Sequence, residues 1–440
     1  MNLLDTDLGS ICRCLDLVSA DPEAIVDCYF ERSEESGLVA GAIANVEVHR
    51  EEGFAVRLVA GDGAFIASRD RIDGDTFLEA LRRTARRMAT GMVPTPRLRP
   101  SPWPRAEPDE AMPVFGAAVA RELRRRRLAF PHRLVVRHHR RWLQVVGREL
   151  VGDVESEAYF SVRTESEAGR WGALLPDLGA EAASRVARAL GAGFRARDAD
   201  SPEPGRCDLV LGAPAAAVLL HEAAHALEID TLAVTGNPDS AVGFRFGSEC
   251  LDLLDDPAAA PETVKRRTDD EGVPVLRRWL LRGGLICQPL ADRRWAAESP
   301  SVSPGAARRQ SRHWAPGPRS HHLELVAGTV SGRELVAGVR HGLFAAEATR
   351  GWLDPSTGAF ELSFAHGRKI LGGELTERVG PFALRGKVGL VLGSVAAVAD
   401  RTVVSGAGWC AKGGQKLPVW GTSAAMLLEG VDIVEGQRDA

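Results

Sequence analysis

The chain of 440 residues lacks the features that mark several large protein classes. No apolar run approaches the ~20 residues that a membrane-spanning helix needs, and no basic segment followed by an apolar core begins the chain. We therefore expect neither a membrane span nor a secretion signal. The net charge is only −4, which does not favour a nucleic-acid partner. The seven cysteines are irregularly spaced and odd in number, so a disulfide framework is not expected and a reducing cytoplasm fits best.

What the chain does contain is typical of a globular protein with sizeable cores. Hydrophobic residues make up 45% and charged residues 26%, and the length suits two or three domains. The one strongly basic segment, residues 121–141, holds the adjacent His138 and His139. Aromatic residues are sparse there and no recognition-helix pattern is visible. We interpret the segment as charged helix and strand surface instead of a phosphate-binding site.

Apolar spacing predicts an α+β fold in three parts. These are an N-terminal α/β domain over residues 1–93, a mixed middle domain over 109–205 and a β-rich C-terminal domain over 206–440. Six prolines within residues 94–108 indicate a linker. Helices are predicted at residues 7–31, 75–92, 111–127 and 178–190, and strands at 38–47, 54–59, 134–137, 142–146, 209–211, 373–375, 388–392 and 431–434.

The most informative motif is His221-Glu222-Ala223-Ala224-His225, which follows an apolar strand and an alanine-rich stretch that favours a helix. Histidines four apart on a helix face the same direction, so both imidazoles can reach one metal ion. Glu222 can then take a proton from an attacking water. Chance predicts only ~0.02 such matches in this composition. The alternative is that both histidines are hydrogen-bonded core residues.

A catalytic zinc site usually has three protein ligands, so the motif needs a third. Glu228 is close in sequence and shares the helical face of His225, either as a ligand or as a carboxylate that orients an imidazole. Cys410 lies in a glycine-rich segment, residues 406–419, which we predict to be a loop, and it is either a thiolate ligand or a buried structural thiol. Other candidate ligands are His313, His321 and His322, in or beside the Arg-, Ser- and Pro-rich loop of residues 301–318.

Several of these stretches occur in the order seen in a known family. The chain resembles the TldD/PmbA metalloprotease family, also described as gyrase modulators. Beyond the histidine motif, the resemblance rests most specifically on Cys410-Ala411-Lys412-Gly413-Gly414-Gln415 with Pro418-Val419. One departure is that the family usually spaces its histidines five apart. Further matching stretches are residues 52–57, 63–68, 246–250, 269–274 and 308–311.

The resemblance implies a site and an activity for the C-terminal domain. His221, His225 and Cys410 would be the metal ligands, Glu222 the general base, and Glu228 a residue behind a ligand. With Zn²⁺ as the cofactor, the expected activity is cytoplasmic hydrolysis of small unfolded peptides or peptide precursors. The resemblance also implies a dimer, either a homodimer or a heterodimer with a PmbA-like subunit. This chain retains all the ligand types and so resembles the metal-binding, TldD-like subunit.

The shortened histidine spacing keeps a second function open. In that reading the chain is a non-catalytic subunit that binds peptides and presents them to a related protease subunit. The two hypotheses differ in the role of Glu222, which only the enzyme needs for cleavage.

Overall fold

The computed structural model of the chain describes residues 4, 8–19, 21, 23–40, 46–60, 63–85, 111–128, 132–148, 151–166, 169–236, 238–299 and 301–437. The predicted linker over residues 94–108 lies outside these ranges. Within them, no helix has the length and apolar character required to cross a membrane.

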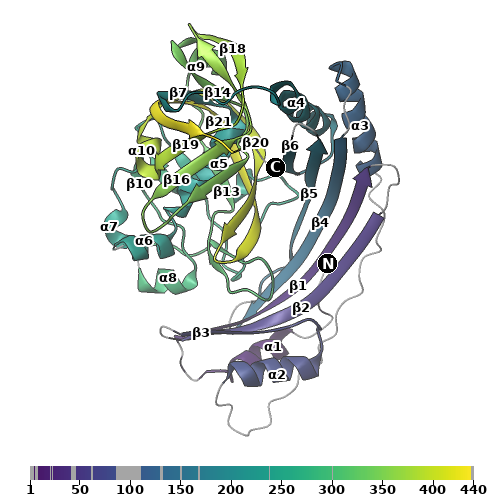
Figure 1. Ribbon diagram of the computed structural model, residues 1–440. Helices are drawn as coiled ribbons and strands as arrows, with labels where there is room; N and C mark the ends of the chain where they lie inside the picture. The colour runs from purple at the N-terminus through teal and green to yellow at the C-terminus, as the bar shows by residue number, and fades with distance from the viewer. Residues whose placement is uncertain are drawn as a thin grey trace.

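A long, curved antiparallel sheet forms one side of the molecule (Figure 1). Its strand order is β3-β2-β1-β4-β5-β6, and β1 pairs along most of its length with both β2 and β4. The elements of this half are α1 (Leu8–Leu15), β1 (Ile25–Ala40), β2 (Val46–Ala60), β3 (Gly63–Arg69), α2 (Gly74–Thr84), α3 (Ala111–Arg125), β4 (His132–Gly147), β5 (Glu155–Ser166), β6 (Gly169–Leu175) and α4 (Ala180–Ala196).

Two helix pairs cover opposite ends of the curved sheet. Helices α1 and α2 bury Leu15 and Phe77 against β1 and β2, where Phe77 contacts the ring of Phe54. Helices α3 and α4 bury Phe115 and Val186 over β4, β5 and β6. The spacing of these apolar residues follows the helical period, so burial of one face explains why the segments are helices.

The C-terminal half is a β-rich body that contains the longest strands. It comprises β7 (Gly205–Leu211), α5 (Ala213–His225), α6 (Ile229–Thr235), α7 (Pro238–Ala241), β8 (Leu253–Asp255), a 3₁₀ turn (Pro257–Ala259), β9 (Arg278–Arg282), β10 (Leu285–Ile286), α8 (Arg293–Glu298), β11 (Ala307–Arg308), β12 (Gly317–Pro318), β13 (His322–Leu325), α9 (Gly332–Ala337), β14 (His341–Ala345), β15 (Arg350–Leu353), β16 (Ala359–Phe364), β17 (Gly367–Leu371), β18 (Glu374–Val379), β19 (Phe382–Lys387), α10 (Val388–Gly393), β20 (Val395–Lys412) and β21 (Gln415–Glu435).

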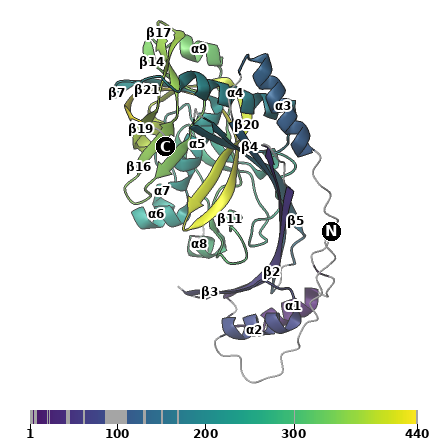
Figure 2. The same ribbon diagram turned by 45° about the vertical axis from the view of Figure 1, so that its right-hand side comes forward.

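Strand β21 organises this body, because it pairs with β20, β7, β19 and β13. The largest apolar core lies around these strands and the buried helix α5. Figures 1 and 2 show the body on the concave side of the curved sheet. The two halves meet where Gly406 of β20 pairs with Leu174 of β6. A Cβ atom at position 406 would lie 2.5 Å from the Cβ of Leu174, so this close approach requires glycine.

The predicted α+β class is confirmed, with four local corrections. The helix predicted at residues 7–31 ends at Leu15, and residues 25–31 begin β1. The strands predicted at 134–137 and 142–146 are one strand, β4. The apolar run 388–392 is helix α10 instead of a strand, because so short a run fits a buried helix equally well. The stretch around Cys410 is a strand, described below. The division into three domains stays a prediction.

Candidate metal centre

Helix α5 presents the two histidines of the motif from inside the C-terminal core. It begins after Gly212 with Pro214 in its first turn, where proline is well tolerated. Position 212 needs glycine because a Cβ atom there would lie 2.7 Å from the carbonyl oxygen of Ala346. His221 is buried and His225 is half-buried at the last turn. The predicted helix is therefore present, and both imidazoles lie close together, with ring centroids 4.7 Å apart.

Cys410 reaches the same place from the β20–β21 hairpin. It pairs with Leu417 of β21, and the hairpin turns through Gly413 and Gly414, whose φ angles are +58° and +77°. Two successive positive φ angles suit the tight turn that matches the twist of the strands, and glycine adopts them without strain. The predicted glycine loop is thus wrong for Cys410 itself: the glycines make the turn, and the cysteine lies on the strand before it.

The structure brings His221, His225 and Cys410 into one cluster, in which one ligand atom from each lies within 4.8 Å of the others. The Cys410 Sγ atom is 3.2 Å from His225 Nε2. Within the described residues, neither ring nitrogen of His221 has a hydrogen-bond partner, although both are buried. An imidazole left this way is unfavourable unless something else binds it. Two nitrogens and one sulfur suit Zn²⁺, so these residues fit the metal.

The surroundings favour a thiolate at Cys410. Burial alone would raise the thiol pKa, but the adjacent His221 and His225 outweigh it and lower the pKa to about 5. Arg319 also donates a hydrogen bond of 2.7 Å from Nη1 to Sγ and one of 2.6 Å from Nη2 to the Lys412 carbonyl. The thiolate is the form that binds metals.

A carboxylate holds His225 from the side opposite the cysteine. Glu228 Oε1 lies 2.9 Å from His225 Nδ1, which leaves Nε2 directed at the cluster. Lys412 Nζ donates to Glu228 Oε2 at 2.5 Å and to Asp230. Burial opposes the charge on Glu228, yet His225 and Lys412 lower its pKa to about 2. A histidine that binds a metal is usually oriented by a carboxylate at its other ring nitrogen, as His225 is by Glu228.

The place of Glu228 in the chain differs from the prediction. Helix α5 ends at His225, and Glu228 lies just before α6 instead of on the same helix face. The orienting contact that one reading of the sequence anticipated is present nevertheless. Of the alternative ligands, His313 contacts Ser68 and Asp70, His322 contacts Thr422, and His321 lies beside Asp255, all apart from the cluster.

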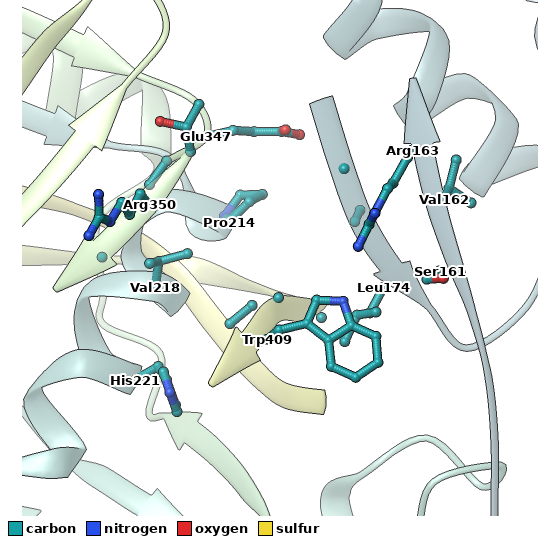
Figure 3. A pocket seen from close by; sticks show the side chains of 18 of the residues that line it. Ser161, Val162, Arg163, Leu174, Pro214, Val218, His221, Glu347, Arg350 and Trp409 are labelled. Atoms are coloured by element: carbon teal, nitrogen blue, oxygen red, sulfur yellow. The ribbon is translucent and has the colours of Figure 1, made fainter. Parts of the chain in front are cut away.

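Glu222 lies outside the ligand cluster and lines a cavity. The cavity has a volume of about 310 Å³ and separates β5 and β6 from α5, β15 and β20. Glu222 packs so closely on β15 that a Cβ atom at Gly351 would lie 2.4 Å from its Cγ. Figure 3 shows His221 and Val218 on one wall of this space and Arg163 on the other, with Trp409 between them. Glu222 therefore faces a space open to a small ligand.

Three residues of this site carried little or no signal in the sequence. Lys412 belongs to the cysteine motif, where its charge was visible but its partners were not. Arg319 and Gly351 are distant in sequence from both motifs, and only the folded chain brings them to Cys410 and Glu222.

Comparison with known proteins gives this geometry a context. Residues 204–434 match the model of the PmbA/TldA metallopeptidase C-terminal domain, slightly more than half of the chain. The chain belongs to the TldD/PmbA family. The family resemblance predicted from the sequence is thus confirmed, and the matched segment contains the whole histidine and cysteine cluster.

Curated relatives match over the same half. A Metalloprotease TldD homolog from Haemophilus influenzae is 29% identical over 236 residues, covering 52% of this chain and 48% of that one. A Metalloprotease from Methanothermobacter thermautotrophicus is 30% identical, covering 50% and 48%. A Zinc metalloprotease TldD homolog from Saccharolobus solfataricus is 24% identical, covering 50% and 49%. The chain spans about half the length of these relatives in the matches.

Solved structures resemble the fold of this chain over nearly its whole length. TldE from Thermococcus kodakarensis superposes with a TM-score of 0.73 at 17% identity, covering 97% of this chain and 100% of that one. A protein described as a modulator of DNA gyrase from Bacteroides thetaiotaomicron gives 0.72 at 16% identity, covering 98% and 100%. At this identity the likeness shows the fold, including the curved sheet outside the family-model match.

Proposed function

We propose that this TldD/PmbA family member is a zinc-dependent metallopeptidase. The observation that carries the proposal is the buried His221, His225 and Cys410 cluster, with Glu222 beside it at the edge of a cavity. These three side chains would hold Zn²⁺, which supplies Lewis acidity for hydrolysis when bound. The names of the relatives support the same activity.

The residues around the cluster have separable roles in this proposal. The Glu222 carboxylate accepts a proton from the attacking water and delivers it to the leaving amine. Glu228 and Arg319 orient His225 and Cys410 through the contacts described above. Residues 408–412 of β20 pair with β21 on one side and have no strand neighbour on the other among the described residues. An extended peptide could therefore add to this free edge through main-chain hydrogen bonds.

This mode of binding favours unfolded substrates, because a folded chain cannot offer a free strand to the edge. We accordingly propose small unfolded peptides or peptide precursors in the cytoplasm as substrates. Family membership supports assembly as a homodimer or as a heterodimer with a PmbA-like subunit, and TldE is among the structural neighbours.

The test separates the enzyme from a peptide-binding subunit. Glu222→Gln is expected to keep about one zinc per chain and to cleave unfolded peptides about 100- to 10,000-fold more slowly, since it removes only the proton acceptor. The exposed Glu377, which pairs with Lys369, provides the control variant Glu377→Gln. Cleavage by the parent that survives Glu222→Gln would contradict the assigned role. A zinc-loaded parent that binds peptides without cleaving them would favour the non-catalytic subunit.

A further inference from the structure

The cavity beside Glu222 contains more positive than negative side chains. Its walls include Arg163 of β5, Arg185 of α4 and Arg350 of β15, against the two carboxylates Glu222 and Glu347. Glu347 is already engaged, because Arg185 Nε lies 3.7 Å from Oε1 and Trp171 Nε1 donates to Oε2 at 2.5 Å. The remaining guanidinium groups therefore outnumber the carboxylates that can neutralise them.

Two exposed cations line this space, Arg350 on β15 and, on the opposite wall, Arg163. Within the described part of the chain, the Arg163 side chain makes neither an ion pair nor a hydrogen bond. Its neighbours across the sheet are Val135 of β4 and Gly172 of β6, and neither carries a charge. Two positions along β5, Glu165 is paired with Arg133 and Arg170. Thus no neighbouring strand supplies a carboxylate for Arg163.

The direction of Arg163 relates it to the metal cluster. Figure 3 shows its side chain extending from β5 into the space opposite Val218 and His221. Arg163, Arg350, His221 and Glu222 line the same cavity of about 310 Å³, at the lower end of the volumes of small-ligand pockets, roughly 300–1,000 Å³. Such a space suits a short peptide segment whose carbonyl lies near Glu222 while a neighbouring group meets Arg163.

We propose that Arg163 determines specificity by binding a carboxylate of the peptide, with Arg350 adding positive potential from the opposite wall. The inference rests on the proposed function, because it names the substrate class for the same site. A guanidinium binds a carboxylate through paired, charge-assisted hydrogen bonds. The carboxylate is either the C-terminus of the peptide or an Asp or Glu side chain next to the scissile bond, and both present the same chemistry to Arg163.

Binding distinguishes this proposal from the proposed activity. The zinc-loaded Glu222→Gln protein is titrated calorimetrically with four versions of one unstructured hexapeptide: Glu or Gln at one inner position, each with a free or an amidated C-terminus. We expect the protein with Arg163 to prefer peptides with a carboxylate. Arg163→Gln should lose at least about tenfold in affinity for those peptides alone, because the charge-assisted hydrogen bonds to the carboxylate are lost. The amidated and Gln-containing peptides reveal which carboxylate is bound.

The matched control is Arg188→Gln, an exposed arginine of α4 that contacts Ser184 and does not line the cavity. It should keep the preference of the parent. Equal affinities for charged and neutral peptides in the parent, or a preference that persists in Arg163→Gln, would overturn the inference. Because affinity is measured in a variant that need not cleave, a protein that binds carboxylate peptides selectively but never hydrolyses them would refute the proposed activity and support the role of Arg163.

Discussion

Two buried polar regions of this molecule differ in whether their side chains pair as opposite charges. Where the curved sheet meets residues 266–271, Arg57 pairs with Asp27 and with Glu271, and Arg266 pairs with Glu157 and Asp270. In the metal centre, His221 has no hydrogen-bond partner within the described residues. In the first region, which we call the balanced region, opposite charges pair across the two halves of the chain, although Arg266 Nε and Arg309 Nε have no hydrogen-bond partner within the described residues. In the metal centre, which we call the incomplete region, the proposed metal ion is the partner that His221 lacks.

Some of the family-like stretches outside the metal motifs also lie in the ion-pair region. The matching stretches 269–274 and 308–311 lie at the ion-pair region, where Asp269 accepts the Ala307 N–H and Asp270 accepts the Arg309 N–H. Their contacts connect the C-terminal body to the sheet that forms the far wall of the cavity. Buried ion pairs of this kind add little net stability but are sensitive to loss of one partner.

The largest effect is expected from removing a ligand of the incomplete region. His221→Ala should reduce zinc from about one per chain to none, because two protein ligands hold the ion much more weakly than three. Metal analysis of purified protein measures the change, with His313→Ala as a control outside the cluster. Retention of stoichiometric zinc in His221→Ala would contradict the ligand set. Chelation should also lower the melting temperature of the parent but not of this variant.

Breaking the balanced region should leave zinc bound while the fold weakens. Arg57→Met strands the buried Asp27 and Glu271, so the free energy of unfolding should fall by about 3–5 kcal/mol. Urea titration of the zinc-loaded proteins gives this value. The control is Arg133→Met, whose exposed partner Glu165 lies 3.7 Å away and whose loss should change stability by about 0–1 kcal/mol. Similar losses in both variants would mean that burial does not distinguish the pairs.

A smaller effect should follow when only the support of a ligand changes. Glu228→Gln keeps the shape of the side chain but removes the charge that faces His225 and Lys412, so zinc affinity should fall about 10- to 100-fold with the ligands intact. Competition with a chromogenic chelator measures the affinity. Asp230→Asn, which also removes a partner of Lys412 but does not contact His225, should weaken binding less. Equal losses would assign the effect to Lys412 instead of to His225.

The sequence identified the local part of the metal centre and missed the parts assembled by folding. The motif from His221 to His225 could be recognised because its spacing matches one helical face, and Cys410 because of its surrounding motif. The strand around Cys410 was missed because its glycines suggested a loop, whereas its pairing with β21 decides its conformation. Arg319 had no periodic or motif signal, since its position next to Cys410 depends on contacts about ninety residues apart along the chain.

The smallest of these effects is the pH dependence contributed by one ion pair. Burial opposes the charge on Asp27, but Arg57 outweighs it and lowers the carboxyl pKa below its ordinary value near 4. A lowered folded-state pKa gives stability that is present above pH ~4 and is lost as pH falls below it. The measurement uses Cys410→Ala protein, which removes the contribution of the metal. Between pH 5 and pH 2, the free energy of unfolding of Cys410→Ala should fall more steeply than that of the double variant Cys410→Ala/Arg57→Met. The double variant has lost the cation that favours the charged form of Asp27. Parallel pH profiles would show that the ionisation of Asp27 does not depend on Arg57. The lowered pKa of Asp27 would then have to come from the other cations around it, Arg309 and Arg293.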